Sequence, residues 1–319
     1  MENEPQTLME AVRYFADAGR TLATVVALRW PDGVHCPTCG RTDVSFIATR
    51  RIWECKEKHA KRQFSAKVGT IFEDSPLPLD KWFVAVWSVA NCKNGISSYE
   101  LGRAIGVTQK TAWHMNHRIR LAMKTGSFMK MSGETEADET YVGGLPGNQH
   151  ANKRKSTARG GSTHDKAIVM GILQRTSAEA PSRVHARLIK NANAKNLRGA
   201  VRETVEPGSR LLTDAASGYR GLGTDYVHEV VNHAVEYVRG TVHTNGIENF
   251  WSLLKRGIKG TYVSVEPFHL QRYVEEQTFR FNERKDNDAG RFHKALGGIV
   301  GRRLTYAELT GHAAIQAPA

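Results

Sequence analysis

The sequence predicts an α/β protein in which a mixed sheet with flanking helices follows two smaller modules. From residue 134 onward, short runs rich in apolar and β-branched residues alternate with a helical pattern. Three of the four cysteines lie within residues 36–55, in a region of short strands and turns. A helical block with clear start and stop signals separates these two regions. A chain of 319 residues is long enough for several domains, one of them with a full core.

We expect five segments along the chain. They are an N-terminal helical segment (1–30), a cysteine-bearing module (31–75), a helical module (76–126), the sheet domain (132–290) and a C-terminal tail (291–319). The first segment is expected to hold one helix over residues 7–29, which stops at RWPDG because Pro31 cannot continue a helix. The polar N-terminus shows no secretory signal, and the longest apolar runs are too short to span a bilayer. A cytoplasmic location is therefore expected.

The cysteine-bearing module predicts a metal site. Cys36 and Cys39 form a C-x2-C knuckle, and Cys55 and His59 form a C-x3-H knuckle. Thiolates and imidazole at this spacing suit one structural Zn²⁺ ion in tetrahedral geometry. His35 is the rival for the fourth ligand, but it adjoins Cys36 and would strain the knuckle. The alternative is three buried free cysteines without a metal.

The helical module carries the signals of a helix-turn-helix. Ser97 and Glu100 match a capping box, Gly106 suits the left-handed position after the first helix, and Thr108 can cap the second. The second helix has a polar, basic face of the kind that enters a DNA major groove. The candidate DNA contacts on this face are Gln109, Lys110, Thr111, His114 and Arg118. The alternative is a helical hairpin with a solvated face, but a charge of +13, from 45 Lys and Arg against 32 Asp and Glu, favours a polyanionic partner.

The sheet domain is expected to hold five strands. They lie in ADETYVGG, KAIVMGILQR, RVHARLIK, RLLTDA and HEVVNH, with a helix in NAKNLRGAVRETV and two closing helices over 247–259 and 267–283. The segment between residues 143 and 166 is rich in Gly, Lys and Arg. It could embrace a phosphate backbone or be an ordinary solvated hairpin.

Three acidic residues of this domain suit a metal-dependent phosphoryl-transfer site. Asp138 lies in the first strand, Asp214 ends the fourth, and Glu248 lies in the first turn of a strongly amphipathic helix. Carboxylates brought together in this way can hold a pair of divalent metal ions that act during in-line displacement at phosphorus. Taken alone, Glu248 could instead serve as a capping residue, since it stands three residues after Asn245.

Two further patterns concern the neighbours of these acids. Strand alternation puts Asp138 on one side and makes Glu139 point away from it. In the helix, Glu248 shares a polar face with Ser252, Lys255 and Lys259. The two lysines could contact the DNA backbone, although a solvated face would have the same pattern.

With these motifs in order, the chain resembles bacterial insertion-sequence transposases of the DDE type that carry an N-terminal zinc ribbon. The resemblance covers about residues 5–290 and includes RWPDGVHCPTCG, RQFSAKVGTIFEDSPLPL, GVTQKTAWHMNHRIR, ADETYVGG, LLTDAASGY and HTNGIENFWSLLKRGIKGTY. It implies a ribonuclease H-like catalytic domain with Asp138, Asp214 and Glu248 as the metal-binding triad and Lys255 in contact with DNA. His243 and Asn245 would help to order the third acid. The chain departs from the family pattern at His59, where a cysteine is more usual.

The resemblance implies a DNA transposase that binds the terminal inverted repeats of its own insertion sequence. Two Mg²⁺ ions, or Mn²⁺, would support cleavage at the element end and strand transfer into target DNA. The expected partner is double-stranded DNA in the nucleoid, bound by a homodimer or a larger assembly. The alternatives are a non-catalytic DNA-binding protein, such as a repressor derived from a transposase, and a nuclease on the same fold.

Overall fold

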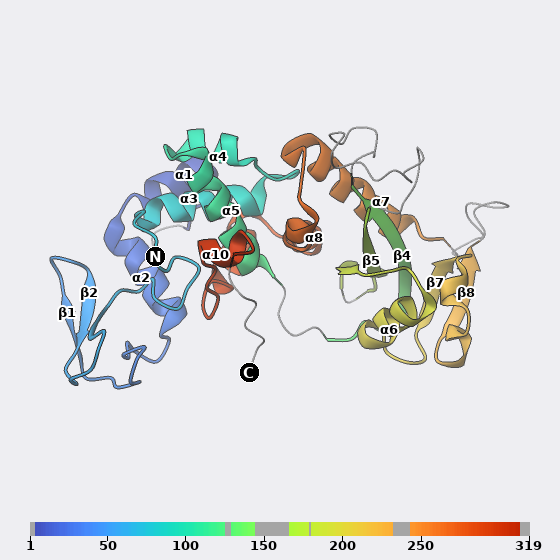
Figure 1. Ribbon diagram of the computed structural model, residues 1–319, viewed down its shortest axis with the longest axis horizontal. Helices are drawn as coiled ribbons and strands as arrows, with labels where there is room; N and C mark the ends of the chain where they lie inside the picture. Colours follow the sequence, from blue (N-terminus) through green and yellow to red (C-terminus); the bar gives the residue numbers. More distant parts are fainter. Residues whose placement is uncertain (1–3, 125–128, 144–165, 179, 232–242, 313–319) are drawn as a thin grey trace. The chain divides into compact units, whose positions relative to one another are not determined.

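The computed structural model describes residues 4–124, 129–143, 166–178, 180–231 and 243–312, shown in Figure 1. The chain divides into two compact units, one formed by residues 1–124 with 286–319 and the other by residues 125–285. The basic stretch at residues 144–165 lies outside the described residues. None of the described helices is long and apolar enough to cross a membrane.

The N-terminal segment of the first unit folds as two helices, so the prediction of one helix over 7–29 is wrong. They are α1 (Leu8–Phe15) and α2 (Ala18–Arg29). The side chain of Asp17 accepts hydrogen bonds from the N–H groups of Gly19 and Arg20, at 2.6 and 3.1 Å, and so begins a new helix. The chain can therefore turn, and Phe15 packs edge-on against Phe83 with 4.9 Å between ring centroids.

The cysteine-bearing module is a three-stranded antiparallel sheet. Its strands are β1 (Val44–Ile47), β2 (Ile52–Cys55) and β3 (Gln63–Phe64), in the order β1-β2-β3. The rings of Trp30, Trp53 and Phe64 lie within 5.7 to 6.3 Å of one another and supply a small apolar core. The sheet is too small to bury much more, which is typical of modules that depend on a metal for stability.

Three helices follow, and the predicted caps are confirmed. They are α3 (Leu79–Asn91), α4 (Ser98–Ile105) and α5 (Gln109–Met123). Ser97 and Glu100 form a capping box, Gly106 adopts the left-handed conformation with φ 63°, and the Thr108 side chain caps α5. Two unpredicted helices, α9 (Asp288–Gly297) and α10 (Tyr306–Leu309), pack against α3 and α5 respectively.

The second unit contains a five-stranded mixed sheet with flanking helices, which confirms the predicted fold class. The strands are β4 (Glu134–Val142), β5 (Ala167–Gln174), β6 (Arg183–Ile189), β7 (Arg210–Asp214) and β8 (Val227–Val231), in the order β6-β5-β4-β7-β8. The first three strands pair antiparallel, and β4, β7 and β8 pair parallel. The helices are α6 (Ala194–Thr204), α7 (Asn245–Arg256) and α8 (Pro267–Asn282), with short 3-10 turns at Ser217–Tyr219 and Leu222–Thr224.

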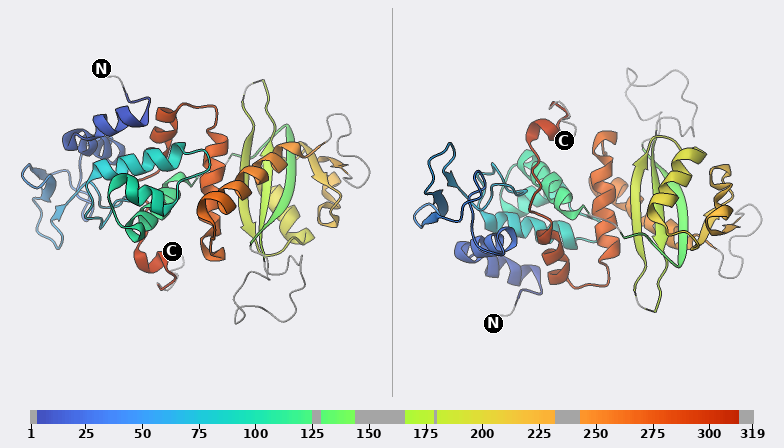
Figure 2. Two further views of the ribbon diagram at one scale, coloured as in Figure 1. Left: turned by 90° about the horizontal axis from the view of Figure 1, so that it is seen from above. Right: turned by 90° about the horizontal axis from the view of Figure 1, so that it is seen from below.

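Helices cover both faces of this sheet. Figure 2 shows α7, in orange, in front of the sheet in one view, and α6, in yellow-green, in front in the opposite view. Alternate residues of β5 serve the two cores, because successive side chains of a strand point to opposite faces. Met170 and Ile172 join the cluster under α6, whereas Val169 and Leu173 join the cluster under α7 and α8. The strand that carries Asp138 therefore runs between two packed layers.

Candidate active site and metal centre

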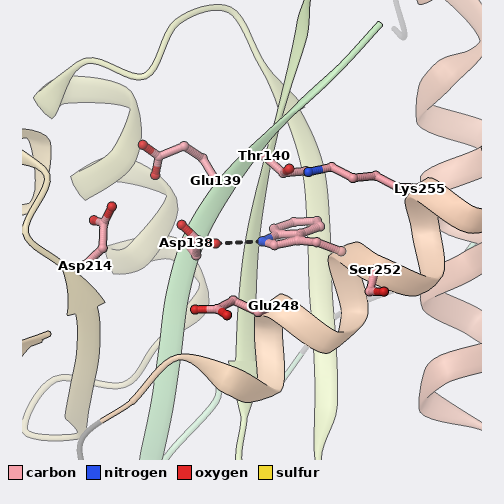
Figure 3. Close-up of a pocket in the computed structure, with 8 residues that line it drawn as sticks. Asp138, Glu139, Thr140, Asp214, Glu248, Ser252 and Lys255 are labelled. Carbon is pink, nitrogen blue, oxygen red and sulfur yellow. Dashed lines mark hydrogen bonds between the residues drawn. The ribbon is translucent and has the colours of Figure 1, made fainter. Parts of the chain in front are cut away.

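A pocket of about 450 Å³ opens where β7 stops beside β4. The strand β4 pairs with β5 as far as Val142, but with β7 only over residues 134–137. Beyond that point the β7 side of β4 has no neighbouring strand in the described sheet. The pocket in this notch is lined by Asp138, Glu139, Thr140, Asp214, Glu248, Trp251, Ser252 and Lys255 (Figure 3). The structure thus brings the three predicted acids and one predicted lysine together from β4, β7 and α7.

Asp138 is fixed by a hydrogen bond across the pocket wall. The indole N–H of Trp251 donates to Asp138 Oδ2 at 2.8 Å, the dashed line in Figure 3. Burial, as the largest cause, and the charges of Glu139 and Asp214 together raise the pKa of Asp138 to about 6, against the opposing effect of the indole hydrogen bond. The ionised form of Asp138 is therefore held at a cost that a nearby cation would relieve.

The other two acids are placed by the ends of their elements. Asp214 is the last residue of β7, and its Oδ1 accepts a hydrogen bond from the Ala216 N–H at 3.0 Å in the following turn. Glu248 lies in the first turn of α7, where its Oε1 accepts from the Thr244 hydroxyl at 2.9 Å. The helix begins at Asn245, so Glu248 lies one residue too late for the N3 position of a capping box.

Glu139 lines the same pocket, although alternation along the strand predicts that it points away. It does lie on the opposite face of β4 from Asp138, where the Tyr219 hydroxyl donates to its Oε2 at 2.7 Å. Because β7 has ended, no neighbouring strand of the described sheet separates the two faces at this point, and both side chains reach the notch. Burial raises the pKa of Glu139, as does the charge of Asp214. Sequence periodicity could not show this, because it gives the face of a strand but not the length of its partner.

The two lysines of the predicted polar face have different positions. Lys255 lines the pocket together with Ser252, whereas Lys259 is exposed and is not among the pocket residues. The α-helix ends at Arg256 and continues as a π-helix over Gly257–Tyr262. A π-turn takes up an extra residue, so the i, i+4 spacing no longer keeps Lys259 on the face of Lys255.

The donor set of this pocket suits a hard divalent cation. Three carboxylates from separate elements face one small space, and the charge of Asp214 contributes to the raised pKa of Asp138. Oxygen-only donors of this kind are what Mg²⁺ and Mn²⁺ prefer. Asp138, Asp214 and Glu248 are therefore the residues that could hold such ions.

The cysteine-bearing module contains a second group of metal ligands. The ligand atoms of Cys36, Cys39, Cys55 and His59 all lie within 4.8 Å of one another, and Cys36 Sγ is 3.5 Å from His59 Nε2. Burial opposes ionisation of Cys36, but backbone N–H groups in the knuckle lower its pKa to about 6, which favours the thiolate that binds a metal. The group fits a structural Zn²⁺ ion. His35 is not part of it, and its ring lies 6.0 Å from Trp30.

The predicted reading face of α5 is only partly free. Gln109, Lys110, Thr111 and His114 lie at its first turns, beside Tyr306 of α10, whose ring is 4.9 Å from Lys110 Nζ. Arg118, in contrast, is buried, so its predicted outward position is wrong. Its guanidinium donates to the backbone carbonyls of Leu304, Ile71 and Glu73, at 3.0, 3.0 and 2.6 Å. Arg118 ties three segments of the first unit together and leaves the set of candidate DNA contacts.

The sequence is similar to those of known transposases. Residues 130–282 match the ISXO2-like transposase domain, and residues 20–60 match a transposase zinc-ribbon domain. An uncharacterized protein in transposable element ISH50 of Halobacterium salinarum is 30% identical over 260 residues, which cover 78% of this chain and 85% of that protein. The chain belongs to the ISXO2-like transposase family. An uncharacterized transposase-like protein of Haemophilus influenzae is 29% identical over 101 residues, 31% of this chain and 81% of that protein.

As a transposase, the chain is a DNA-processing enzyme, and its zinc ribbon and mixed sheet are those of the family. The sequence reasoning missed three residues around the pocket: Glu139, Tyr219 and Trp251. Tyr219 and Trp251 are both buried. The polar atoms of these two buried aromatic rings bind pocket carboxylates, as buried Tyr and Trp polar atoms commonly find partners. The one feature of the sequence that could have indicated any of them is that Glu139, an acid, directly follows Asp138.

Proposed function

We propose that this transposase binds the ends of its own insertion sequence and catalyses metal-dependent DNA cleavage followed by strand transfer. The observation that supports it most is the convergence of Asp138, Asp214, Glu248 and Lys255 on one pocket. These residues come from three elements that together span more than a hundred positions of sequence, from Asp138 to Lys255. A solvated surface would not need this convergence.

Each pocket residue has a proposed part in the reaction. Asp138, Asp214 and Glu248 would hold two Mg²⁺ or Mn²⁺ ions, which supply activation of the attacking oxygen and stabilisation of the leaving oxygen. Trp251 fixes the orientation of the Asp138 carboxylate through its indole N–H. Lys255, on the wall of the same pocket, would bind a DNA phosphate and set the scissile bond in line. Water would be the first nucleophile, and the freed 3′-hydroxyl the second, at the same site.

The first unit would supply recognition of the element ends. The helix α5 starts from a capped, left-handed turn, and its first turns carry Gln109, Lys110, Thr111 and His114. This is the part of a helix-turn-helix that reaches base edges in a major groove. The zinc ribbon and Lys259 would add backbone contacts, and cleavage at two ends would need two copies of the chain.

The decisive experiment uses a plasmid that carries the gene with its native flanking DNA. Purified protein is incubated with it in Mg²⁺, and the 3′ ends and joined products are mapped. The controls are EDTA and the Glu248→Gln variant. Breaks at the repeat ends that depend on metal and on Glu248, together with joined products, would support the proposal.

Two other outcomes separate the alternatives. Cutting at the ends without joined products would favour a nuclease on this fold. Tight binding to the ends with no cutting in any metal would favour a DNA-binding protein that has lost its chemistry.

A further inference from the structure

The helix that carries Glu248 begins without a cap of its own. The side chain of its N-cap residue, Thr244, does not cap the amides of the first turn but donates to Oε1 of Glu248. The missing partner comes from another element, because Oε2 of Glu136 on β4 accepts a hydrogen bond from the Ile247 N–H at 2.9 Å. This is the third amide of the helix, one of those that a capping serine or aspartate would bind.

The negative charge of the buried Glu136 carboxylate has a favourable partner at each of its two oxygens. Its side chain is 1% exposed, a position in which an unpaired charge would be strongly unfavourable. Oε2 faces the positive end of the α7 dipole. Oε1 accepts from Arg175 Nε at 2.7 Å, and the same guanidinium donates to the His243 carbonyl at 2.7 Å. Arg175 therefore also holds the residue that precedes the start of α7.

A second hydrogen bond joins the same strand and helix. Glu136 and Asp138 are two residues apart on β4 and lie on one face, and Ile247 and Trp251 are four residues apart on α7 and lie on one face. Glu136 binds the first of these helix residues and Asp138 binds the second. Two bonds at matched spacing prevent the helix from sliding or rotating on the strand.

The helix α7 packs closely on the sheet at two glycines. A Cβ atom at Gly246 would lie 2.8 Å from Oε2 of Glu136, and one at Gly171 would lie 2.5 Å from the Trp251 ring. Real Cβ contacts are essentially never that short. The α7 backbone at Gly246 thus lies against the Glu136 carboxylate of β4, and the Trp251 ring of α7 lies against the backbone of β5 at Gly171.

We infer that Glu136 is a positioning residue of the transposase active site: as a buried cap supplied by β4, it sets the place of Glu248 relative to Asp138. Glu248 follows the capped Ile247 amide directly, so any fraying of the first turn would move its carboxylate. Glu136 itself does not line the pocket and so would act only through α7. The inference rests on the proposed function, in which the pocket carboxylates bind divalent metal ions.

The test measures Mn²⁺ binding to the full-length protein by electron paramagnetic resonance, alongside cleavage of element-end DNA. Loss of a group that orients a metal ligand typically lowers metal affinity about 10- to 100-fold. We expect Glu136→Ala to weaken Mn²⁺ binding and the cleavage rate by this factor, with DNA affinity unchanged. Glu136→Gln, which keeps an oxygen acceptor of the same reach, should restore a large part of both.

Glu134→Gln is the matched control. Glu134 lies on the same strand, and its carboxylate pairs with Arg175 and Arg210 rather than with an amide of α7. This variant removes the same charge and should stay within about threefold of the native Mn²⁺ affinity, below the loss expected for a displaced ligand. A loss of Mn²⁺ affinity of about 10-fold or more in both Glu134→Gln and Glu136→Gln would show that the charge, and not the hydrogen bond to Ile247, matters, and would overturn the inference.

Failure of the inference can be told from failure of the proposed function. If Mn²⁺ binding survives Asp214→Asn and Glu248→Gln, the metal site is wrong and the inference falls with it. If those variants abolish binding but a folded Glu136→Ala binds Mn²⁺ like the native protein, the positioning role alone is refuted. If Glu136→Ala does not fold, Gly246→Ala decides, because its methyl group would push the carboxylate off the Ile247 amide. Native Mn²⁺ affinity in Gly246→Ala would then refute the role.

Discussion

Replacing Asp138 by asparagine should stabilise the metal-free protein while removing its metal-dependent activity. Burial, together with the charges of Glu139 and Asp214, raises the pKa of Asp138 from 3.8 to about 6. Asparagine has the same shape, carries no charge, and keeps an oxygen that can accept the Trp251 indole hydrogen bond. The substitution therefore removes the unfavourable charge and little else.

The size and sign of the effect follow from linkage. A pKa raised by about 2 units in the folded state corresponds to about 3 kcal/mol between the protonated and ionised forms. The folded state binds the Asp138 proton more tightly than the unfolded state does. The stability that this proton gives to the native fold is therefore fully present below about pH 4 and is lost as the pH rises through 6. Relative to the native chain, Asp138→Asn should gain up to about 3 kcal/mol at pH 8 and roughly half of that at pH 5.

Denaturant unfolding of both proteins at pH 5 and pH 8, in buffer freed of divalent cations other than bound zinc, measures this difference. Asp225→Asn is the control, since it removes an exposed ion pair with Arg202 and should not stabilise the chain at either pH. Adding Mg²⁺ should make the native protein the more stable of the two, because only its intact metal site is stabilised by binding the ion. An Asp138→Asn protein that is less stable than the native chain at pH 8 without Mg²⁺ would refute the reasoning.

Four further changes test other parts of the molecule. Gly171→Ala places a methyl group against Trp251 and should lower the free energy of unfolding by about 1–3 kcal/mol. It should also abolish cleavage of element-end DNA, and native-like melting would contradict this expectation. Cys39→Ser should lower zinc content, measured by mass spectrometry, well below one ion per chain. Lys255→Met should weaken DNA binding and reduce its salt dependence by about one ion, with Mn²⁺ binding intact. Arg118→Met should lose about 3 kcal/mol of stability in denaturant melts, since it leaves buried carbonyls unpaired, and unchanged stability would show that those bonds contribute little.

Local signals in the sequence gave much of the architecture. Helix caps depend only on neighbouring residues and can therefore be predicted from the sequence. The structure confirms the capping box at Ser97, the left-handed Gly106 and the cap at Thr108. The five strands were legible for the same reason, because alternation and turn residues are local. The break at Asp17 was also a local signal, an aspartate at a helix start, but the apolar pattern on either side concealed it.

The features that could not be predicted from the sequence depend on contacts between residues far apart in the chain. The outward face predicted for α5 fails at Arg118 because Leu304, 186 positions later, returns to accept its hydrogen bond. The position of Glu139 depends on where β7 ends, and the cap on Ile247 comes from Glu136, 111 positions earlier. Periodicity assigns a side chain to a face, but it cannot say what covers that face. The convergence of the three acids was suggested by their settings and by family resemblance, not by their spacing.

The departures from local rules in the second unit gather around one pocket. An α-helix without its own cap, a carboxylate with its pKa raised to about 6, and a change from α- to π-helix all lie between Asp138 and Tyr262. The first two of these departures are compensated by contacts from elsewhere in the fold. The cap comes from Glu136, and the carboxylate is held by Trp251. Such concentration is expected where a fold gives up local stability for a site. It follows that the acids are held in place by the protein before any cation arrives, so that a metal ion would find its ligands already arranged.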